Sequence, residues 1–213
     1  MRRAAIASCI LVVCSLSLLT WKQCGTYRNE ETLWRHAFLQ NPAGGVVQER
    51  VGVTLMQRKR MRAAMAHLSA ALKVDSTYAP WHYNIACALF EQKEYDGAIA
   101  EYGEALRIRP RFGLASKGLA DSLAGLGRYE EAVTEYRRAL ELGLNSADVH
   151  YNLGQIFTKW SRYADAVGEY ESALRINSND ADTWERLGAA WLALGNRTRA
   201  DAALAEAMRR RSK

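Results

Sequence analysis

Small residues and tyrosines recur along this chain at a fixed interval of 34 positions. The alanines form two series, Ala64, Ala98, Ala132, Ala166 and Ala200, and Ala37, Ala71, Ala105, Ala139, Ala173 and Ala207. The tyrosines form two more, Tyr95, Tyr129 and Tyr163, and Tyr102, Tyr136 and Tyr170, while Gly127, Ser161 and Gly195 share an expected turn position. A constant period of this length indicates a repeat architecture in which each unit stacks on its neighbours.

Within one period the apolar pattern is helical. In residues 79–112, Ile85 and Leu89 are four positions apart, and Ala98, Tyr102 and Ala105 follow the spacing i, i+4, i+7. These spacings predict two helices with one apolar stripe each. Alanines on the stripes allow two helix axes to approach closely. We therefore expect each unit to be a helix hairpin that buries its apolar faces only by stacking.

Two units carry closely related motifs in their first helix, YNIA at 83–86 and YNLG at 151–154, followed by Tyr near the turn and Ala, Tyr and Ala in the second helix. With these motifs the chain resembles the tetratricopeptide repeat family. The resemblance implies an all-α solenoid of five helix hairpins, at 45–78, 79–112, 113–146, 147–180 and 181–213. The unit at 45–78 is the most divergent, and Pro110 is the only proline kept at the end of a unit.

Residues 22–44 are interpreted as a junction that contains a lone second helix, or half repeat, with the sequence TYRNEETLWRHAFLQNP at 26–42. Together with the apolar segment and the Trp-Lys-Gln exit before it, this junction resembles that of multi-spanning, protein O-mannosyltransferase-like glycosyltransferases that end in tetratricopeptide repeats. The family's catalytic loop and its many membrane helices have no counterpart here. This resemblance implies an alternative function, the carboxy-terminal repeat fragment of such an enzyme without its catalytic domain.

Residues 4–21 are uncharged and apolar, and they follow Arg2 and Arg3. A helix of this length reaches about 27 Å, close to the hydrocarbon thickness of a bilayer. We expect residues 1–21 to form a single transmembrane anchor, with a cleaved signal peptide as the alternative. The charges nearest the apolar run favour a cytoplasmic amino terminus, which would place the repeats on the non-cytoplasmic side, in a periplasm or lumen.

The net charge of +6 is concentrated at the two ends of the chain. Residues 1–44 carry five basic and two acidic residues, residues 45–208 carry 20 and 21, and residues 209–213 carry four and none. The basic clusters Arg58–Arg62 and Arg209–Lys213 have no interleaved aromatics, which nucleic-acid binding would favour. The repeats are therefore nearly neutral, and we expect no nucleic-acid partner.

The sequence contains no Gly-rich phosphate loop, no HExxH and no GxSxG motif. Its four histidines, His36, His67, His82 and His150, are scattered and have no second metal ligand at helical spacing. We therefore predict no enzyme activity, no cofactor, no metal site and no small-molecule substrate.

The family resemblance implies that the first helices line a concave groove in which extended peptides bind. Carried over by position, the candidate groove residues are Tyr83, Asn84, Lys117, Asp121, Tyr151, Asn152, Gln155, Lys159 and Arg186. Asn84 and Asn152 fit best because an amide offers a donor and an acceptor to a peptide backbone, although asparagine is also simply common at this repeat position. Gly118 stands where a chaperone-type carboxylate clamp needs its central asparagine. The sequence thus predicts a membrane-anchored scaffold that binds a protein or peptide.

Overall fold

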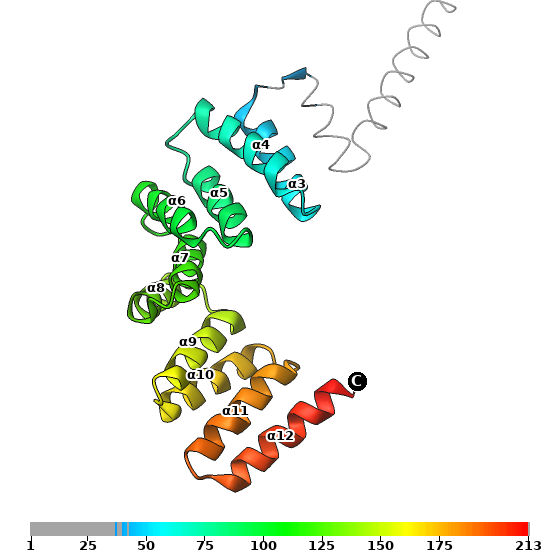
Figure 1. The fold of residues 1–213 in the computed structure, drawn as a ribbon, viewed down its shortest axis with the longest axis vertical. Helices are drawn as coiled ribbons and strands as arrows, with labels where there is room; N and C mark the ends of the chain where they lie inside the picture. Colours follow the sequence, from blue (N-terminus) through cyan, green and yellow to red (C-terminus); the bar gives the residue numbers. More distant parts are fainter. Residues whose placement is uncertain (1–36, 38–39, 42, 213) are drawn as a thin grey trace, which may run out of the picture. The chain divides into compact units, whose positions relative to one another are not determined.

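The structure is a computed structural model that describes residues 37, 40–41 and 43–212. This part of the chain contains ten α-helices and no strands (Figure 1). The helices are α3 (Gly45–Gln57), α4 (Met61–Val74), α5 (Ala79–Glu91), α6 (Tyr95–Ile108), α7 (Gly113–Gly125), α8 (Tyr129–Glu141), α9 (Ala147–Lys159), α10 (Tyr163–Ile176), α11 (Ala181–Ala193) and α12 (Arg197–Arg211). The first helices of the pairs therefore begin 34 residues apart.

Every turn between the two helices of a pair has the same backbone conformation. A residue with positive φ occupies one repeat position in all five turns: Lys59 (58°), Lys93 (62°), Gly127 (78°), Ser161 (57°) and Gly195 (77°). The next N–H then bonds back to a carbonyl five residues earlier, as from Arg128 to Leu123 at 2.9 Å. This is a Schellman motif, which satisfies the carbonyls at the end of the first helix. Lys59 and Lys93 adopt a conformation that is costly for a residue with a Cβ.

The described helices divide into two compact units, an N-terminal unit that ends at Ala88 and a C-terminal unit that begins at Leu89. The division falls within α5. In the N-terminal unit α3 packs against α4, and in the C-terminal unit each helix from α6 to α12 packs against the next one. The C-terminal unit is therefore an α-helical solenoid in which each helix packs chiefly on its neighbours in sequence.

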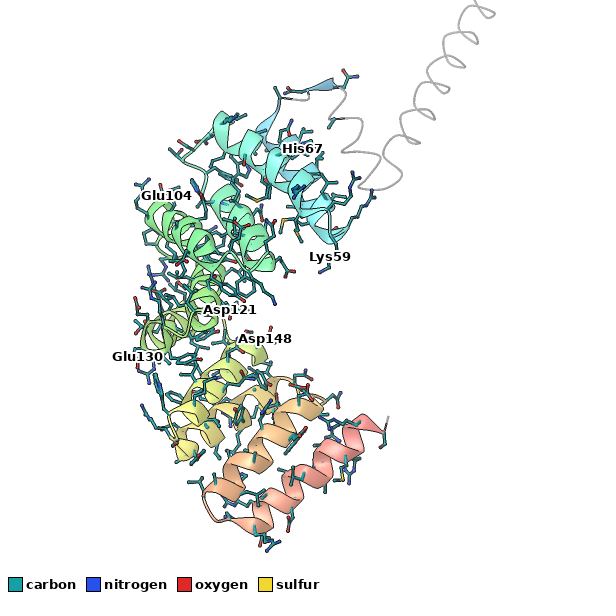
Figure 2. All side chains as sticks on the ribbon, viewed as in Figure 1. Lys59, His67, Glu104, Asp121, Glu130 and Asp148 are labelled. Carbon is teal, nitrogen blue, oxygen red and sulfur yellow. The ribbon has the colours of Figure 1, made fainter. Side chains whose placement is uncertain are left out.

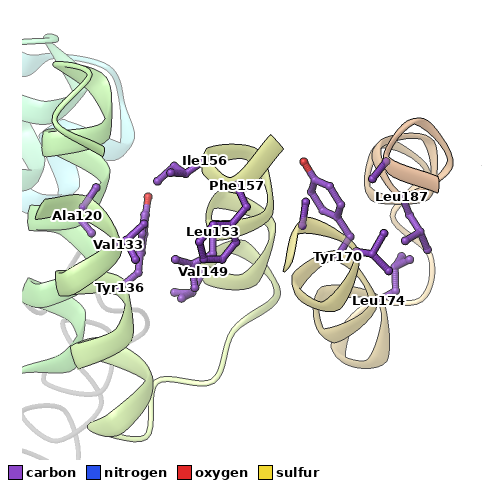
Figure 3. Close-up of a cluster of buried hydrophobic side chains, with 14 of the residues drawn as sticks. Ala120, Val133, Tyr136, Val149, Leu153, Ile156, Phe157, Tyr170, Leu174 and Leu187 are labelled. Atoms are coloured by element: carbon purple, nitrogen blue, oxygen red, sulfur yellow. The ribbon is translucent and has the colours of Figure 1, made fainter. Parts of the chain in front are cut away.

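The core of the C-terminal unit is one cluster of apolar side chains that runs from Ala120 on α7 to Ala203 on α12 (Figure 3). Tyr136 and Tyr170 are the largest side chains that are fully buried. The cluster passes from one helix pair to the next without a break, so no pair in this unit buries its apolar face alone.

Close approach of the paired helices depends on small residues. The alanines Ala64, Ala98, Ala132, Ala166 and Ala200 are each 0% exposed. The first helix is equally constrained, because a Cβ on Gly154 would lie 2.6 Å from the Tyr170 ring and one on Gly188 would lie 3.3 Å from the Ala200 carbonyl oxygen. The alanine series of the sequence is thus the series of contact points between helices.

The predicted all-α hairpins are confirmed for the described residues. Among these residues, no helix combines the length and the apolar character that a membrane crossing requires. The predicted membrane segment at 4–21 lies outside the described residues, as does most of the half repeat at 26–42, of which only Ala37, Gln40 and Asn41 are described. Both assignments stay predictions.

Ala200→Leu should destabilise the last helix pair, because the added atoms would meet α11 at its closest approach. We expect the free energy of opening of α11 and α12 to fall by about 1–3 kcal/mol, as measured by hydrogen exchange of their amides. Ala202→Leu makes the same change at an exposed position of the same helix and should leave protection nearly unchanged. Equal effects of the two substitutions would contradict the packing assignment.

Candidate functional site

A hollow of about 560 Å³ opens between α7, α8 and α9 in the C-terminal unit. We call it the α7–α9 hollow. Figure 2 shows Asp121 on α7 and Asp148 at the start of α9, which both line it. Six of the nine candidate groove residues line this hollow, namely Lys117, Asp121, Tyr151, Asn152, Gln155 and Lys159. The remaining lining residues were not predicted as groove residues: Phe90, Ala124, Tyr129, Tyr136, Asp148 and Ile156.

Helical spacing explains why these side chains share one wall. Asp148, Asn152, Gln155 and Lys159 follow one another at intervals of four, three and four along α9, so they lie on one face of the helix. Neighbouring positions such as Leu153 are buried in the core instead. The wall is therefore polar along its length, acidic at the first turn of α9 and basic at the last.

Asp121 is the centre of a hydrogen-bond network at the base of the hollow. Its carboxylate accepts from Lys117 Nζ at 2.7 Å, from the Tyr136 hydroxyl at 2.5 Å and from Asn152 Nδ2 at 3.1 Å. Burial, the negative charge of Asp121 and the hydrogen bond to it raise the pKa of Tyr136 well above its ordinary value, while the bond from Asn152 lowers it. The Tyr136 phenol is therefore held neutral as a donor.

The network fixes the orientation of the Asn152 amide. Asp121 can only accept, and the Tyr136 hydroxyl has already given its proton to Asp121, so both neighbours require a donor from Asn152. Nδ2 supplies it to both, at 3.1 Å to Asp121 and 3.0 Å to the Tyr136 oxygen. The carbonyl oxygen of the amide thus remains available as an acceptor on the wall of the hollow. The sequence predicted that the Asn152 amide would offer both a donor and an acceptor to a peptide. In the structure its amide nitrogen bonds within the protein, so only the acceptor remains.

A second, smaller hollow of about 290 Å³ adjoins the first between α9, α10 and α11. We call it the α9–α11 hollow. It is lined by Gln155, Thr158, Lys159, Tyr170 and Arg186, of which Gln155 and Lys159 also line the α7–α9 hollow. Burial raises the pKa of the Tyr170 phenol, although its hydrogen bond with Thr158 lowers it. The candidate residue Arg186 therefore lines a hollow together with Gln155 and Lys159, which are also candidate groove residues.

Gly118 and Asn152 occupy the same repeat position on successive first helices, and each contacts the buried tyrosine of the preceding pair. Tyr136 hydrogen-bonds Asn152, and its counterpart Tyr102 packs where a Cβ on Gly118 would lie 2.3 Å from the ring. Glycine at 118 is thus required by the Tyr102 ring, and no amide can occupy that place. This agrees with the absence of a chaperone-type clamp.

The remaining candidates, Tyr83 and Asn84, lie in the N-terminal unit. Asn84 Nδ2 donates to Glu49 Oε1 at 2.9 Å, and Trp81 Nε1 donates to Glu49 Oε2 at 2.9 Å. Asn84 is therefore bound as Asn152 is, through its amide nitrogen to a carboxylate on an earlier first helix. Tyr83 is half-buried.

The carboxy-terminal basic cluster is engaged in ion pairs. Arg211 contacts Asp182 at 2.9 Å and Glu185 at 2.5 Å, while Arg209 and Arg210 both pair with Glu206. These arginines therefore connect the last helix to α11 and to itself. In the described part of the chain, no group of His, Cys, Asp and Glu is arranged to hold a metal ion.

These features define a solenoid of helix hairpins with a polar wall on its first helices. Models of the tetratricopeptide repeat match residues 79–112 and 147–180, and a TPR repeat model matches residues 120–159. The chain therefore contains tetratricopeptide repeats, and its described part has the all-α fold of such repeats.

Solved structures with this fold include YrrB, which is a TPR protein with an unusual peptide-binding site. YrrB is 20% identical, with a TM-score of 0.68 over 84% of this chain and 93% of YrrB. PilF of Pseudomonas aeruginosa is 19% identical, with a TM-score of 0.74 over 89% and 86%. MamA of Desulfovibrio magneticus RS-1 is 15% identical, with a TM-score of 0.72 over 79% and 95%. No curated protein sequence matches this chain, and these comparisons give the glycosyltransferase resemblance no support.

Alkaline pH should reveal the buried phenols. Because the folded pKa of Tyr136 and of Tyr170 is raised, their contribution to stability is present below the unfolded value near 10 and is lost as pH rises above it. We expect the free energy of unfolding of Tyr136→Phe to fall less steeply between about pH 9 and about pH 11 than that of the wild type. Urea unfolding followed by circular dichroism measures both slopes.

The double variant Tyr136→Phe/Tyr170→Phe should flatten the slope further, because it removes both phenols. Tyr136→Phe should still fold at neutral pH, since Asp121 keeps its bonds from Lys117 and Asn152. Parallel curves for the three proteins would show that neither phenol is held neutral by the fold.

Proposed function

We propose that this protein is a scaffold that binds an extended peptide, or an extended segment of a protein, in the α7–α9 hollow. The observation that carries the proposal is the polar wall of α9 beside a hollow of about 560 Å³, with an amide oriented by internal hydrogen bonds. An oriented acceptor binds a peptide N–H without first having to be ordered, which lowers the entropic cost of binding. The fold shared with YrrB, itself a peptide-binding TPR protein, supports the same class of function.

The dimensions suit a short extended segment. Asp148 and Lys159 stand at opposite ends of α9, so the wall is roughly 16 Å long at 1.5 Å per residue. An extended chain covers that distance with about five residues. Tyr129 and Tyr151 add aromatic surface to the lining, where apolar side chains of a peptide can pack. We infer that backbone contacts to Asn152 position the peptide and that its side chains contact the tyrosines.

We also propose that the scaffold is anchored in a membrane by residues 4–21, with the repeats on the non-cytoplasmic side. The uncharged length of the segment and the arginines before it support this placement.

Extraction of native membranes with alkaline carbonate tests the anchor. The full chain should stay in the membrane pellet, whereas a variant lacking residues 4–21 should appear in the soluble fraction. The repeats of the full chain should also be digested by protease added on the non-cytoplasmic side only. Release of the full chain by carbonate would contradict the anchor.

Peptide binding can be tested without knowing the natural partner. The full chain, purified in mild detergent, is used to select from a displayed library of random peptides of about seven residues, long enough for the hollow. Affinity of a selected peptide is then measured by fluorescence polarisation. Asn152→Ala should weaken binding about fivefold, because it removes one hydrogen bond to the peptide.

Asn179→Ala serves as the matched control, because Asn179 is exposed in the turn before α11 and lines neither hollow. It should bind as the wild type does. Circular dichroism checks that both variants keep their helicity. If no peptide is enriched over a blank surface, or if Asn152→Ala binds as tightly as Asn179→Ala, the α7–α9 hollow is not the binding site.

A further inference from the structure

The loop between α8 and α9 differs from the other loops that join successive pairs. Four such loops are described, at 75–78, 109–112, 142–146 and 177–180. The loop at 142–146 is the longest, because α8 has 13 residues whereas α4, α6 and α10 have 14 each. Of these four loops, only this one contains a residue with positive φ, Gly143 at 87°, a conformation that glycine adopts at little steric cost. The chain therefore leaves α8 by a backbone path that the other three loops do not share.

The hydrogen bonds of this loop leave the start of α9 incompletely bonded. Gly143 N–H donates to the Leu140 carbonyl at 2.9 Å and Leu144 N–H donates to the Ala139 carbonyl at 3.0 Å, which is the Schellman pattern that closes the turns within pairs. Ser146, the N-cap residue of α9, makes no side-chain cap, and its Oγ is buried without a hydrogen-bond partner among the described residues. A buried polar group in this state lowers local stability.

The packing of α8 on α9 is also the weakest of its kind in the C-terminal unit. We call this packing, together with the loop at 142–146, the α8–α9 joint. Here α8 contacts α9 less extensively than α6 contacts α7 or α10 contacts α11. The apolar cluster still continues across the joint, from Tyr136 on α8 to Val149 and Leu153 on α9 (Figure 3). The joint can therefore bend at low cost without separating its core.

The surface is hollowed on both sides of the α8–α9 joint. The α7–α9 hollow lies on one side, and a hollow of about 460 Å³, which we call the α8–α10 hollow, lies on the other. The α8–α10 hollow is lined by Leu140, Asn145, His150, Ser172, Arg175 and Ile176. On α9, His150 is two positions from both Asp148 and Asn152, or about 200° around the helix, so it faces away from them. A bend at the joint that narrows one hollow therefore widens the other.

Different interactions favour the two directions of bending. On the side of the α7–α9 hollow, polar contacts cross the joint: Asn152 bonds Asp121 at 3.1 Å and the Tyr136 hydroxyl at 3.0 Å. On the side of the α8–α10 hollow the walls include the apolar side chains Leu140 and Ile176, and Ile176 is 45% exposed. Burial of these two side chains favours a bend that narrows the α8–α10 hollow. The same bend draws Asn152 away from its partners.

We propose that the α8–α9 joint is a hinge, and that a peptide in the α7–α9 hollow holds it in the arrangement described above. This regulation rests on the proposed function. The peptide N–H needs the Asn152 acceptor, whose orientation depends on Asp121 and Tyr136 across the joint. Molecules bent toward the α8–α10 hollow lack that oriented acceptor. Peptide affinity is therefore reduced by the fraction of bent molecules, and bound peptide removes that fraction.

The repeat supplies matched positions for measuring the hinge. Asp96, Glu130, Ala164 and Thr198 are exposed, lie 34 residues apart and each follow the first residue of a second helix. Spin labels attached in pairs through an introduced keto amino acid leave the native cysteines of the full chain unchanged. In mild detergent, pulsed electron paramagnetic resonance then gives the distance distribution of each pair. Glu130 with Ala164 spans the α8–α9 joint, and the two flanking pairs span the neighbouring joints as controls.

We expect the free chain to give a broader distribution for Glu130 with Ala164 than for either control pair. A saturating peptide selected from the random library should narrow that distribution and leave the control pairs unchanged.

Gly143→Ala tests the loop itself. Alanine disfavours positive φ, so the substitution should shift the distance between Glu130 and Ala164 and weaken binding of the selected peptide about fivefold. Gly195→Ala is the matched control, because Gly195 also has positive φ, at 77°, but lies in the turn between α11 and α12. It should change neither quantity. If Gly143→Ala behaves as Gly195→Ala does, the loop at 142–146 is not the hinge.

The outcomes separate the hinge from the proposed function. Equal widths for the three pairs in the free chain would overturn the hinge and leave the peptide scaffold in place. A broad distribution across the α8–α9 joint that a bound peptide does not narrow would overturn the coupling of the hinge to the α7–α9 hollow. If no peptide is selected, the proposed function and the coupling both fail, while the widths measured in the free chain still decide whether the joint is a hinge.

Discussion

The close contact between the two helices of each pair is the constraint on which the rest of the structure depends. Ala132 and Ala166 are fully buried at this contact, and the facing helices leave no room for a Cβ at Gly154 or Gly188. With so little side chain between them, the helix axes are held at one separation in pair after pair. A repeated separation gives a repeated rotation, and so every first helix in the C-terminal unit follows the preceding pair in a similar way.

This regular packing also places a tyrosine at the same repeat position in three successive pairs, as Tyr102, Tyr136 and Tyr170. Tyr136 and Tyr170 are buried by the same contacts and occupy the same repeat position. The fold fixes the position of each phenol, and the residue on the next first helix determines its contacts. Asn152 hydrogen-bonds the Tyr136 hydroxyl, whereas Gly118 leaves space for the Tyr102 ring. Chemical variety on a uniform scaffold therefore comes from single positions on the first helices.

The helix pairs could be predicted from sequence because their signals are local and repeated. Period, helical spacing and small residues all lie within one unit, and Gly127 and Gly195 marked their turns for the same reason. The turns at Lys59 and Lys93 could not be predicted in this way, because lysine has no preference for positive φ. The bonds of Asn152 to Asp121 and of Asn84 to Glu49 join residues 31 and 35 positions apart. Such pairings depend on the stacking of successive units, so the sequence could predict which side chains face the groove but not how they are oriented.

The Asn152 amide donates within the protein, and this limits which groups on the wall of α9 can contact a ligand. Near Asn152 the charges of Lys117 and Asp121 cancel at 2.7 Å, and the group left for a ligand is a neutral acceptor. A neutral acceptor of this kind would bind the backbone N–H that every peptide carries, and such a contact would be insensitive to salt. Lys159 lies over the Tyr129 ring, and Arg186 is influenced by Tyr151 and Glu185, so contacts of a ligand with these cations would depend on its charge and would be screened by ions. A peptide bound along α9 as proposed would thus make contacts near Asn152 that ionic strength leaves unchanged and contacts near Lys159 that ionic strength weakens.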